Sequence, residues 1–231
     1  MTQGEIGFLL QNSIQMAFRK HGIHRAVVTV VTQVVIDRND PAFQRPTKPI
    51  GPFYSKEIAE RKRKELGWSI IEDAARGYRR VVASPLPTDI IELEVIKGCL
   101  ERNIVVIAVG GGGIPVIYED GELKGIEAVI DKDRASALLA AKLGIEHFII
   151  STEVPEVYID YKRPHQQQLR SITTAEAKKY CADGQFSEGS MKPKIEAAMD
   201  FLANGGRLVT ITDPGHLIIA LDGDAGTRIT K

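Results

Sequence analysis

The sequence has 231 residues, enough for one large α/β domain or a domain with an appendage, and its 43% hydrophobic content can form a sizeable core. Lys and Arg number 30 and Asp and Glu also number 30, so no overall charge favours nucleic acid or an anionic membrane as partner. No apolar run is long enough to span a bilayer, and the first residues lack the basic start of a signal peptide. Two distant cysteines without metal-site spacing favour a reduced, cytoplasmic protein.

The first third of the chain is predicted to contain helices, strands and one irregular segment. Apolar residues at helical spacing predict a helix over 1–20, and valine-rich 26–36 predicts one long strand. Four prolines in 37–54 indicate an irregular excursion from the sheet. A highly charged helix at 55–66 and two short strands around a turn at Gly77 follow. The whole stretch 37–84 is therefore predicted to project from the main sheet as an inserted subdomain.

The chain is organised around the stretch 103–116, which reads NIVVIAVGGGGIPV. Thr88 is predicted to cap a helix at 89–102 that leads into it. Residues 104–109 are apolar and mostly β-branched, which is typical of a strand buried on both faces. This pattern places the glycines that follow at the carboxyl end of a central strand, where open α/β sheets bind ligands.

Four consecutive glycines end this strand: Gly110, Gly111, Gly112 and Gly113. Without side chains, the main chain there can adopt positive φ, and a row of N–H groups can approach an anion closely. A plain strand-to-loop turn is the alternative interpretation. Because each glycine adds unfolded-state entropy, four in a row favour a phosphate or carboxylate site.

A second junction of interest is Asp131, Lys132 and Asp133, after a hairpin that turns at Asp120-Gly121 and before a helix at 134–143. A lysine between two aspartates at a helix N-terminus suits phosphate chemistry, because the lysine supplies positive charge and an aspartate can orient it. An exposed helix start with a carboxylate cap is an equally good interpretation.

The last third begins with a predicted buried strand at 146–151, followed directly by Thr152. Tyr158 and Tyr161 are candidate walls for a flat ring, although aromatic residues more often belong to the core. Thr173 and Glu176 form the capping-box pattern of a helix that runs to Cys181.

A third junction lies in FSEGSMKPK, residues 186–194, where Ser190 is the predicted N-cap of another helix. Lys192 and Lys194 fall in its first turn, where the helix dipole disfavours cations, so an anion is expected nearby. Asn204 and the two glycines after it close this helix. Final strands are predicted at 207–212 and 227–230.

Alternating strands and helices predict an α/β fold with a mostly parallel sheet and helices on both faces. If this topology brings the three junctions together, they would supply glycine amides, at least two lysines and an orienting carboxylate. Such a set stabilises negative charge during phosphoryl transfer. No GxxxxGK[ST] motif is present, so a kinase would lie outside the P-loop class.

Six segments in order along the chain carry a family resemblance: PTKPIGPFY, VGGGGIPV, VIDKDRASALLA, VPEVYIDYKRP, GSMKPK and AGTRI. Together they resemble the carbamate kinases of the amino acid kinase family. The resemblance implies one amino acid kinase domain over 1–231, built as a three-layer α/β/α sandwich with a mostly parallel central sheet and a small protruding lid at 37–84. It also implies a cytoplasmic homodimer of arginine metabolism that transfers phosphate reversibly between MgATP and carbamate, giving ADP and carbamoyl phosphate.

The resemblance also implies roles for individual residues. Lys132 and Lys194 would stabilise the transferring phosphoryl group, and Asp133 would hold them in place. Lys48 would close over the carbamate or phosphate, and the four glycines would line the substrate side. The residues expected near the nucleotide are Asp131, Thr152, Tyr158, Tyr161, Ser190 and Met191. ATP or ADP with Mg²⁺ is the expected cofactor, and no metal ligand is expected in the protein.

The sequence departs from the family pattern in two places. Lys192 stands where a small or apolar residue is expected. The strand ending in Gly-Gly-Asn and the His-Gly-Asn-Gly-Pro-Gln loop that open family members are not found, so the chain is expected to lack the family's N-terminal segment. A non-catalytic nucleotide-binding remnant therefore stays open as an alternative. A related acyl-phosphate kinase with another small substrate is a further alternative, although TKPIGPFY weighs against it.

Overall fold

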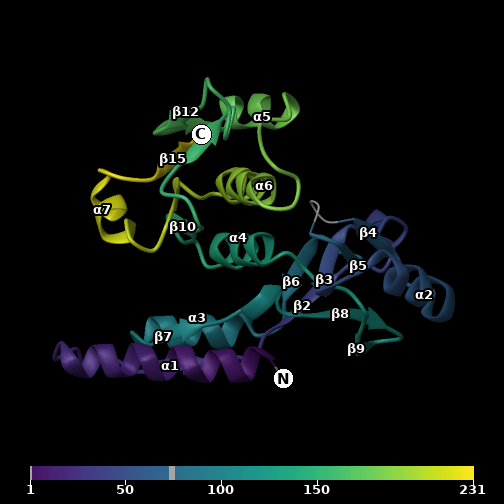
Figure 1. Ribbon diagram of the computed structural model, residues 1–231. Helices are drawn as coiled ribbons and strands as arrows, with labels where there is room; N and C mark the ends of the chain where they lie inside the picture. Colours follow the sequence, from purple (N-terminus) through teal and green to yellow (C-terminus); the bar gives the residue numbers. More distant parts are fainter. Residues whose placement is uncertain (1, 73–75) are drawn as a thin grey trace. The chain divides into compact units, whose positions relative to one another are not determined.

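The computed structural model describes residues 2–72 and 76–231, which divide into two compact units, 1–132 and 133–231 (Figure 1). Strands and helices alternate in both units, which confirms the α/β class. The sheets are mixed: β1–β7, β2–β8, β10–β14 and β13–β15 pair in parallel, and the other pairs are antiparallel. Within the two described ranges, no helix is both long and apolar enough to cross a membrane.

The elements of the first unit, with the short 3₁₀ turns written η, are α1 (Thr2–Lys20), β1 (Val27–Thr29), β2 (Gln33–Ile36), η1 (Pro41–Phe43), β3 (Lys48–Tyr54), α2 (Lys56–Leu66), β4 (Ile70–Glu72), β5 (Tyr78–Val82), β6 (Pro87–Ile90), α3 (Leu93–Glu101), β7 (Val105–Ile107), η2 (Gly110–Gly112), β8 (Ile114–Glu119) and β9 (Glu122–Gly125). Helix α4 (Lys132–Lys142) begins at the last residue of this unit.

The second unit continues with β10 (His147–Ser151), β11 (Val157–Ile159), β12 (Gln167–Leu169), β13 (Ser171–Thr173), α5 (Thr174–Ala182), α6 (Met191–Ala203), β14 (Leu208–Thr212), α7 (Leu217–Asp222) and β15 (Thr227–Thr230). These elements confirm the predicted strands at 146–151, 207–212 and 227–230.

The predicted long strand at 26–36 is wrong, because it is broken into β1 and β2, which pair in different sheets. The break centres on Thr32, which is fully buried. Its hydroxyl donates to the Val30 carbonyl at 2.9 Å and accepts from the Val109 N–H at 3.0 Å. Its backbone N–H donates to the Gln3 side chain at 3.1 Å. A side chain therefore takes the Thr32 N–H, while the Thr32 carbonyl still accepts from the Ile114 N–H at 2.8 Å.

Residues 37–84 contain more regular structure than predicted. The expectation of an irregular excursion is wrong for 48–54, which form β3, an edge strand of the three-stranded sheet β3-β5-β4. Its two prolines fit there, because an edge strand leaves one row of backbone groups unpaired. Gly51, at φ 69°, lies in the stretch where the β3–β5 pairing slips. Helix α2 and the strands on both sides of Gly77 are as predicted, whereas 73–75 lie outside the described residues.

The predicted helix at 89–102 begins later than expected, at Leu93. Thr88 does not cap it, since 87–90 form strand β6 and the Thr88 hydroxyl donates to the Val35 carbonyl at 3.0 Å. Glu92 precedes the helix, and its carboxylate accepts from the backbone N–H of Gln33 at 2.7 Å. The pairing of β6 with β2 thus takes the residues that the capping pattern assigned to the helix.

The core of the second unit surrounds the sheet β10-β14-β15-β13. Helix α6 supplies several fully buried apolar residues to it: Ile195, Ala197, Ala198, Phe201 and Leu202. The capping box predicted for Thr173 and Glu176 is present at the start of α5. The hairpin at Asp120-Gly121 in the first unit is also confirmed, with φ 54° and 80°. Local sequence patterns therefore predicted this capping box and this hairpin correctly.

Candidate functional site

The glycine run forms a tight turn at the end of β7 rather than an open loop. Gly111, Gly112 and Gly113 have φ values of 66°, 103° and 84°, which confirms the predicted left-handed backbone. The burial prediction for the strand is wrong, because residues 105–107 are only half-buried. Strand β7 is paired with β1 in a two-stranded sheet of the described residues.

Two amides of this turn are used within it. The Gly112 N–H donates to the Val109 carbonyl at 2.9 Å, and the Gly113 N–H donates to the Gly110 carbonyl at 3.1 Å. The expectation that the whole row of amides faces an anion is therefore wrong for these two.

Packing explains why two of the four positions are glycine. A Cβ on Gly112 would lie 2.1 Å from the Ile130 carbonyl oxygen, and one on Gly113 would lie 2.3 Å from Val34 Cγ2. Gly111 differs, because a Cβ there would meet nothing within 4 Å. The plain-turn interpretation thus accounts for Gly112 and Gly113, and Gly111 is the member whose surroundings leave room for a ligand.

An ion pair in the first unit joins two residues that the sequence assigned to different roles. Lys48, the first residue of β3, places its Nζ 2.6 Å from Oδ2 of Asp131. The aspartate side chain is 9% exposed and the lysine 31%. Asp131 was predicted near the nucleotide and Lys48 near the acid substrate, and the structure brings their side chains together.

A second ion pair, in the second unit, is more deeply buried. Lys194 Nζ lies 2.9 Å from Asp133 Oδ2, and the two side chains are 8% and 10% exposed. Lys194 lies in the first turn of α6 and Asp133 in the first turn of α4. The pairing agrees with the prediction that Asp133 orients Lys194, whereas the catalytic roles of both stay predictions.

Three consecutive residues carry this arrangement along the chain. Asp131 and Asp133 are buried, each bound to a lysine from a distant segment, and Lys132 between them is exposed. Helix α4 starts at Lys132, two residues before the predicted start. A helix N-terminus is therefore present at this junction as predicted, although it begins earlier. The exposed Lys132 lies at this N-terminus, where the helix dipole attracts an anion.

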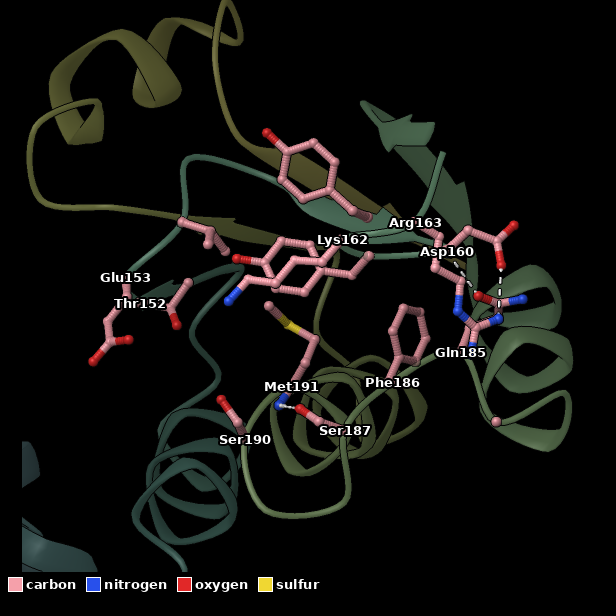
Figure 2. Close-up of a pocket in the computed structure, with 14 residues that line it drawn as sticks. Thr152, Glu153, Asp160, Lys162, Arg163, Gln185, Phe186, Ser187, Ser190 and Met191 are labelled. Carbon is pink, nitrogen blue, oxygen red and sulfur yellow. Dashed lines mark hydrogen bonds and ion pairs between the residues drawn. The ribbon is translucent and has the colours of Figure 1, made fainter. Parts of the chain in front are cut away.

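A cavity of about 380 Å³ opens in the second unit (Figure 2). It lies between the loop after β10, the segment that follows β11, and the loop between α5 and α6. Of the six residues predicted near the nucleotide, Asp131 does not line the cavity. The other five do: Thr152, Tyr158, Tyr161, Ser190 and Met191. A volume of this size fits a small organic ligand.

Two tyrosines form one wall of this cavity. The rings of Tyr158 and Tyr161 have centroids 5.9 Å apart and planes inclined by 32°. The Tyr158 hydroxyl donates to Glu156 at 3.1 Å, and burial, followed by this carboxylate, raises the pKa of Tyr158 above its ordinary value. Tyr161 is 46% exposed, so it is not a core residue. The pair can present a flat, uncharged surface to a ring.

The start of α6 differs from its predicted cap. Ser190 occupies the N-cap position, but its side chain makes no capping hydrogen bond. The Ser187 hydroxyl accepts from the Met191 N–H at 3.2 Å instead, which leaves Ser190 on the cavity lining (Figure 2). Lys192 does not line the cavity, and its Nζ binds Glu188 at 2.6 Å, which raises the pKa of Lys192.

Sequence reasoning missed several residues that line the cavity: Glu153, Asp160, Lys162, Arg163, Gln185 and Phe186. Lys162 and Arg163 follow directly on Tyr161, and Arg163 pairs with Asp160 at 3.3 Å. Charged residues next to a pair of aromatic residues beyond a buried strand were the available signal. Gln185 gave no signal, because its contact depends on a residue 25 positions away.

Comparison with known proteins identifies the fold and the family. Residues 8–213 match the Amino acid kinase family. The chain belongs to the amino acid kinase family. It is 46% identical over 231 residues to "Carbamate kinase" of Thermococcus kodakarensis, covering 100% of this chain and 73% of that one. It is 45% identical over 231 residues to "Carbamate kinase 2" of Enterococcus faecalis, covering 100% and 74%.

Solved structures of this family have the same fold. The carbamate kinase from Giardia lamblia bound to AMP-PNP superposes with a TM-score of 0.90 at 40% identity. The match covers 100% of this chain and 73% of that one. The α/β architecture expected from the resemblance is thus shared with an amino acid kinase family enzyme whose structure holds a nucleotide analogue.

Gly112→Ala should lower the free energy of unfolding by about 3 kcal/mol, because the residue would combine a left-handed backbone with a clash against the Ile130 carbonyl. Urea denaturation measures the change. Gly125→Ala is the control, since a Cβ on Gly125, at the end of β9, would meet nothing within 4 Å and its φ is not positive, and it should lose less than about 1 kcal/mol. Equal losses in the two variants would contradict the packing account.

Asp133→Asn should lower the free energy of unfolding by about 3 kcal/mol, because it removes the charge that compensates the buried Lys194. Glu146→Gln is the control: it breaks the exposed Arg207–Glu146 pair and should change stability by less than about 0.5 kcal/mol. The double variant Asp133→Asn/Lys194→Met should recover part of the loss. No difference between Asp133→Asn and the control in chemical denaturation would show that the buried pair is not needed for folding.

Proposed function

We propose that this protein is a carbamate kinase, which transfers a phosphoryl group reversibly between MgATP and carbamate to give ADP and carbamoyl phosphate. The observation that carries the proposal is the buried Lys194–Asp133 pair, in a chain that is 46% identical over its whole length to an enzyme of that name. A buried ion pair is expensive to desolvate and often stabilises a fold no better than packed apolar residues would. A catalytic role therefore explains this buried pair at two helix starts better than a contribution to the stability of the fold does.

The lysines are assigned to the transferring phosphoryl group. Phosphoryl transfer needs positioning and neutralisation of charge on the equatorial oxygens, rather than covalent participation of the protein. Lys194 is held by Asp133 at 2.9 Å, so its ammonium group needs little reorganisation when charge develops. Lys132, exposed at the first residue of α4, adds a second cation and the positive end of the helix dipole.

The cavity of the second unit is assigned to the nucleotide. Tyr158 and Tyr161 offer a flat surface against which a purine can stack. Met191 extends from the start of α6 into the cavity and can adapt to the ring (Figure 2). Thr152 and Ser190 supply hydroxyl groups for ribose or phosphate oxygens. Asp131, which does not line the cavity, keeps only an indirect role through Lys48.

We assign binding of the acid substrate, carbamate or carbamoyl phosphate, to the first unit. Lys48 would bind carbamate or the phosphoryl group, and Asp131 positions its ammonium. The glycine turn would approach the substrate with main-chain atoms, with Gly111 as its most accessible member. The subdomain at 37–84, formed by β3, β4, β5 and α2, would act as a lid that carries Lys48.

Magnesium is treated as part of the nucleotide substrate. Within residues 2–72 and 76–231 no three His, Cys, Asp or Glu side chains are grouped to hold a metal ion. Asp131 and Asp133 are already paired with lysines. Mg²⁺ usually keeps its waters and binds substrate phosphates rather than a protein cage, so MgADP and MgATP fit these residues as preformed complexes.

The setting follows from the family resemblance. We assign the protein to the cytoplasm as a homodimer, with a role in arginine metabolism. Its free cysteines, Cys99 and Cys181, agree with a reducing compartment.

A coupled assay for ATP formation from MgADP tests the proposed function, with carbamoyl phosphate as donor and acetyl phosphate as comparison. The proposal predicts ATP formation with a kcat/KM at least about tenfold higher for carbamoyl phosphate. A preference for acetyl phosphate would identify a related acyl-phosphate kinase. Tight ADP binding by the folded protein without ATP formation from either donor would favour a non-catalytic nucleotide-binding protein. Either result would overturn the proposal.

Lys48→Ala should raise the KM for carbamoyl phosphate by about tenfold and the KM for MgADP far less, because one charge-assisted contact to the acid substrate is lost. Initial-rate kinetics with each substrate varied in turn measures both constants. Lys124→Ala, which removes a partly exposed lysine paired with Glu119, is the control and should change neither. An equal rise in both KM values for Lys48→Ala would remove Lys48 from the acid-substrate side.

A further inference from the structure

One wall of the cavity is a strained turn in the segment that follows β11. Asp160 and Lys162 have φ values of 50° and 61°, in the left-handed region that residues other than glycine rarely adopt. Tyr161 stands between them on the cavity wall. Left-handed non-glycine residues persist where their surroundings fix them, and they often occur at binding sites.

Two glutamine side chains fix this turn. The Asp160 N–H donates to Gln185 Oε1 at 2.8 Å, and the Lys162 N–H donates to Gln166 Oε1, also at 2.8 Å. Each strained residue thus has its backbone donor satisfied by a glutamine amide. We call this pair of hydrogen bonds the glutamine clamp.

The two glutamines differ in what they connect. Gln166 belongs to the same turn and its own N–H donates to the Arg163 carbonyl at 3.0 Å, so its bond is local. Gln185 comes from the loop between α5 and α6, which lines the cavity through Gln185, Phe186, Ser187 and Ser190. Figure 2 shows Gln185 facing Asp160 across the dashed hydrogen bond. The Gln185 bond therefore links two separate walls of the cavity.

The Gln185 side chain is itself held at its base. Its backbone N–H donates to the Tyr180 carbonyl at 3.0 Å at the end of α5. The next residue, Phe186, is buried and packs edge-on against Tyr180 at 6.4 Å between ring centroids. Because the backbone of Gln185 is already fixed, forming this hydrogen bond costs side-chain entropy only. The loop thus presents a preorganised acceptor to the strained turn.

We propose that Gln185 is a positioning residue for the nucleotide: its side chain holds the strained Asp160–Lys162 turn so that Tyr161 keeps its place against Tyr158. The inference rests on the proposed function only in naming a nucleotide as the ligand of the cavity. Without the Gln185 bond, the Asp160 residue can leave the left-handed region, and the wall formed by the tyrosines loses its fixed spacing. Nucleotide affinity then falls because the wall must be ordered again on binding.

Hydrogen exchange of the free protein tests the clamp without reference to any ligand. Gln185→Met keeps the length of the side chain and removes the acceptor, and Gln185→Glu keeps an acceptor oxygen. Exchange of the Asp160 amide should be about tenfold faster in Gln185→Met and close to the unchanged protein in Gln185→Glu. Gln167→Met makes the same chemical change at an exposed residue outside the cavity lining and should leave this amide unaffected.

Titration calorimetry with MgADP tests the consequence for binding. The Kd for MgADP should rise about three- to tenfold in Gln185→Met, and Gln185→Glu should restore most of the affinity. In turnover, the KM for MgADP should rise more than kcat falls. Slow exchange at Asp160 in Gln185→Met, or fast exchange with an unchanged Kd, would overturn the positioning role. If the unchanged protein binds no MgADP, the proposed function fails instead, and the exchange result still decides whether the clamp exists.

Discussion

The ion pair between Lys194 and Asp133 fixes the starts of two helices of the second unit and places the lysine proposed to act in phosphoryl transfer. Both side chains are about nine-tenths buried, at the starts of α6 and α4, so neither charge can be left without the other. The same two helices are joined again by Arg134 and Glu196 at 2.7 Å. The helix starts are thereby fixed by charge as well as by the apolar core beneath α6. A lysine held in this way has the preorganised position that stabilisation of a transferring phosphoryl group requires.

Much of the fold could be predicted from local sequence. The Thr173–Glu176 capping box, the Asp120-Gly121 hairpin and the left-handed glycines follow from the chemistry of a few neighbouring residues, and all are present. Predictions failed where distant partners decide the structure. Thr32 interrupts a valine-rich strand because Gln3 and Val109 bond to it. The proline-rich stretch beginning at Lys48 becomes a strand because β5 pairs with it at a sheet edge.

In the candidate site, too, local sequence indicated some residues, whereas distant partners decided how they are positioned. Tyr158, Tyr161 and Met191 were recognised by residue type within a motif, and they line one cavity. The partners that position the cationic and aromatic residues come from far along the chain: Asp131 for Lys48, and Gln185 for the turn that carries Tyr161. Residue type indicates which chemistry is present, whereas positioning depends on contacts that no local pattern contains. This difference explains why Gln185 was overlooked and why two of the four glycines turned out to serve packing.

In the proposed mechanism Lys194 acts on the transferring phosphoryl group rather than on the nucleotide, and it also pairs with Asp133 in the fold. The most direct measurement compares kcat for ATP formation from carbamoyl phosphate with the Kd for MgADP in Lys194→Met, with exposed Lys178→Met on α5 as control. We expect kcat to fall about a thousandfold in Lys194→Met, while the Kd for MgADP changes less than about threefold. A folded Lys194→Met protein with a kcat near that of the control would contradict this role of Lys194.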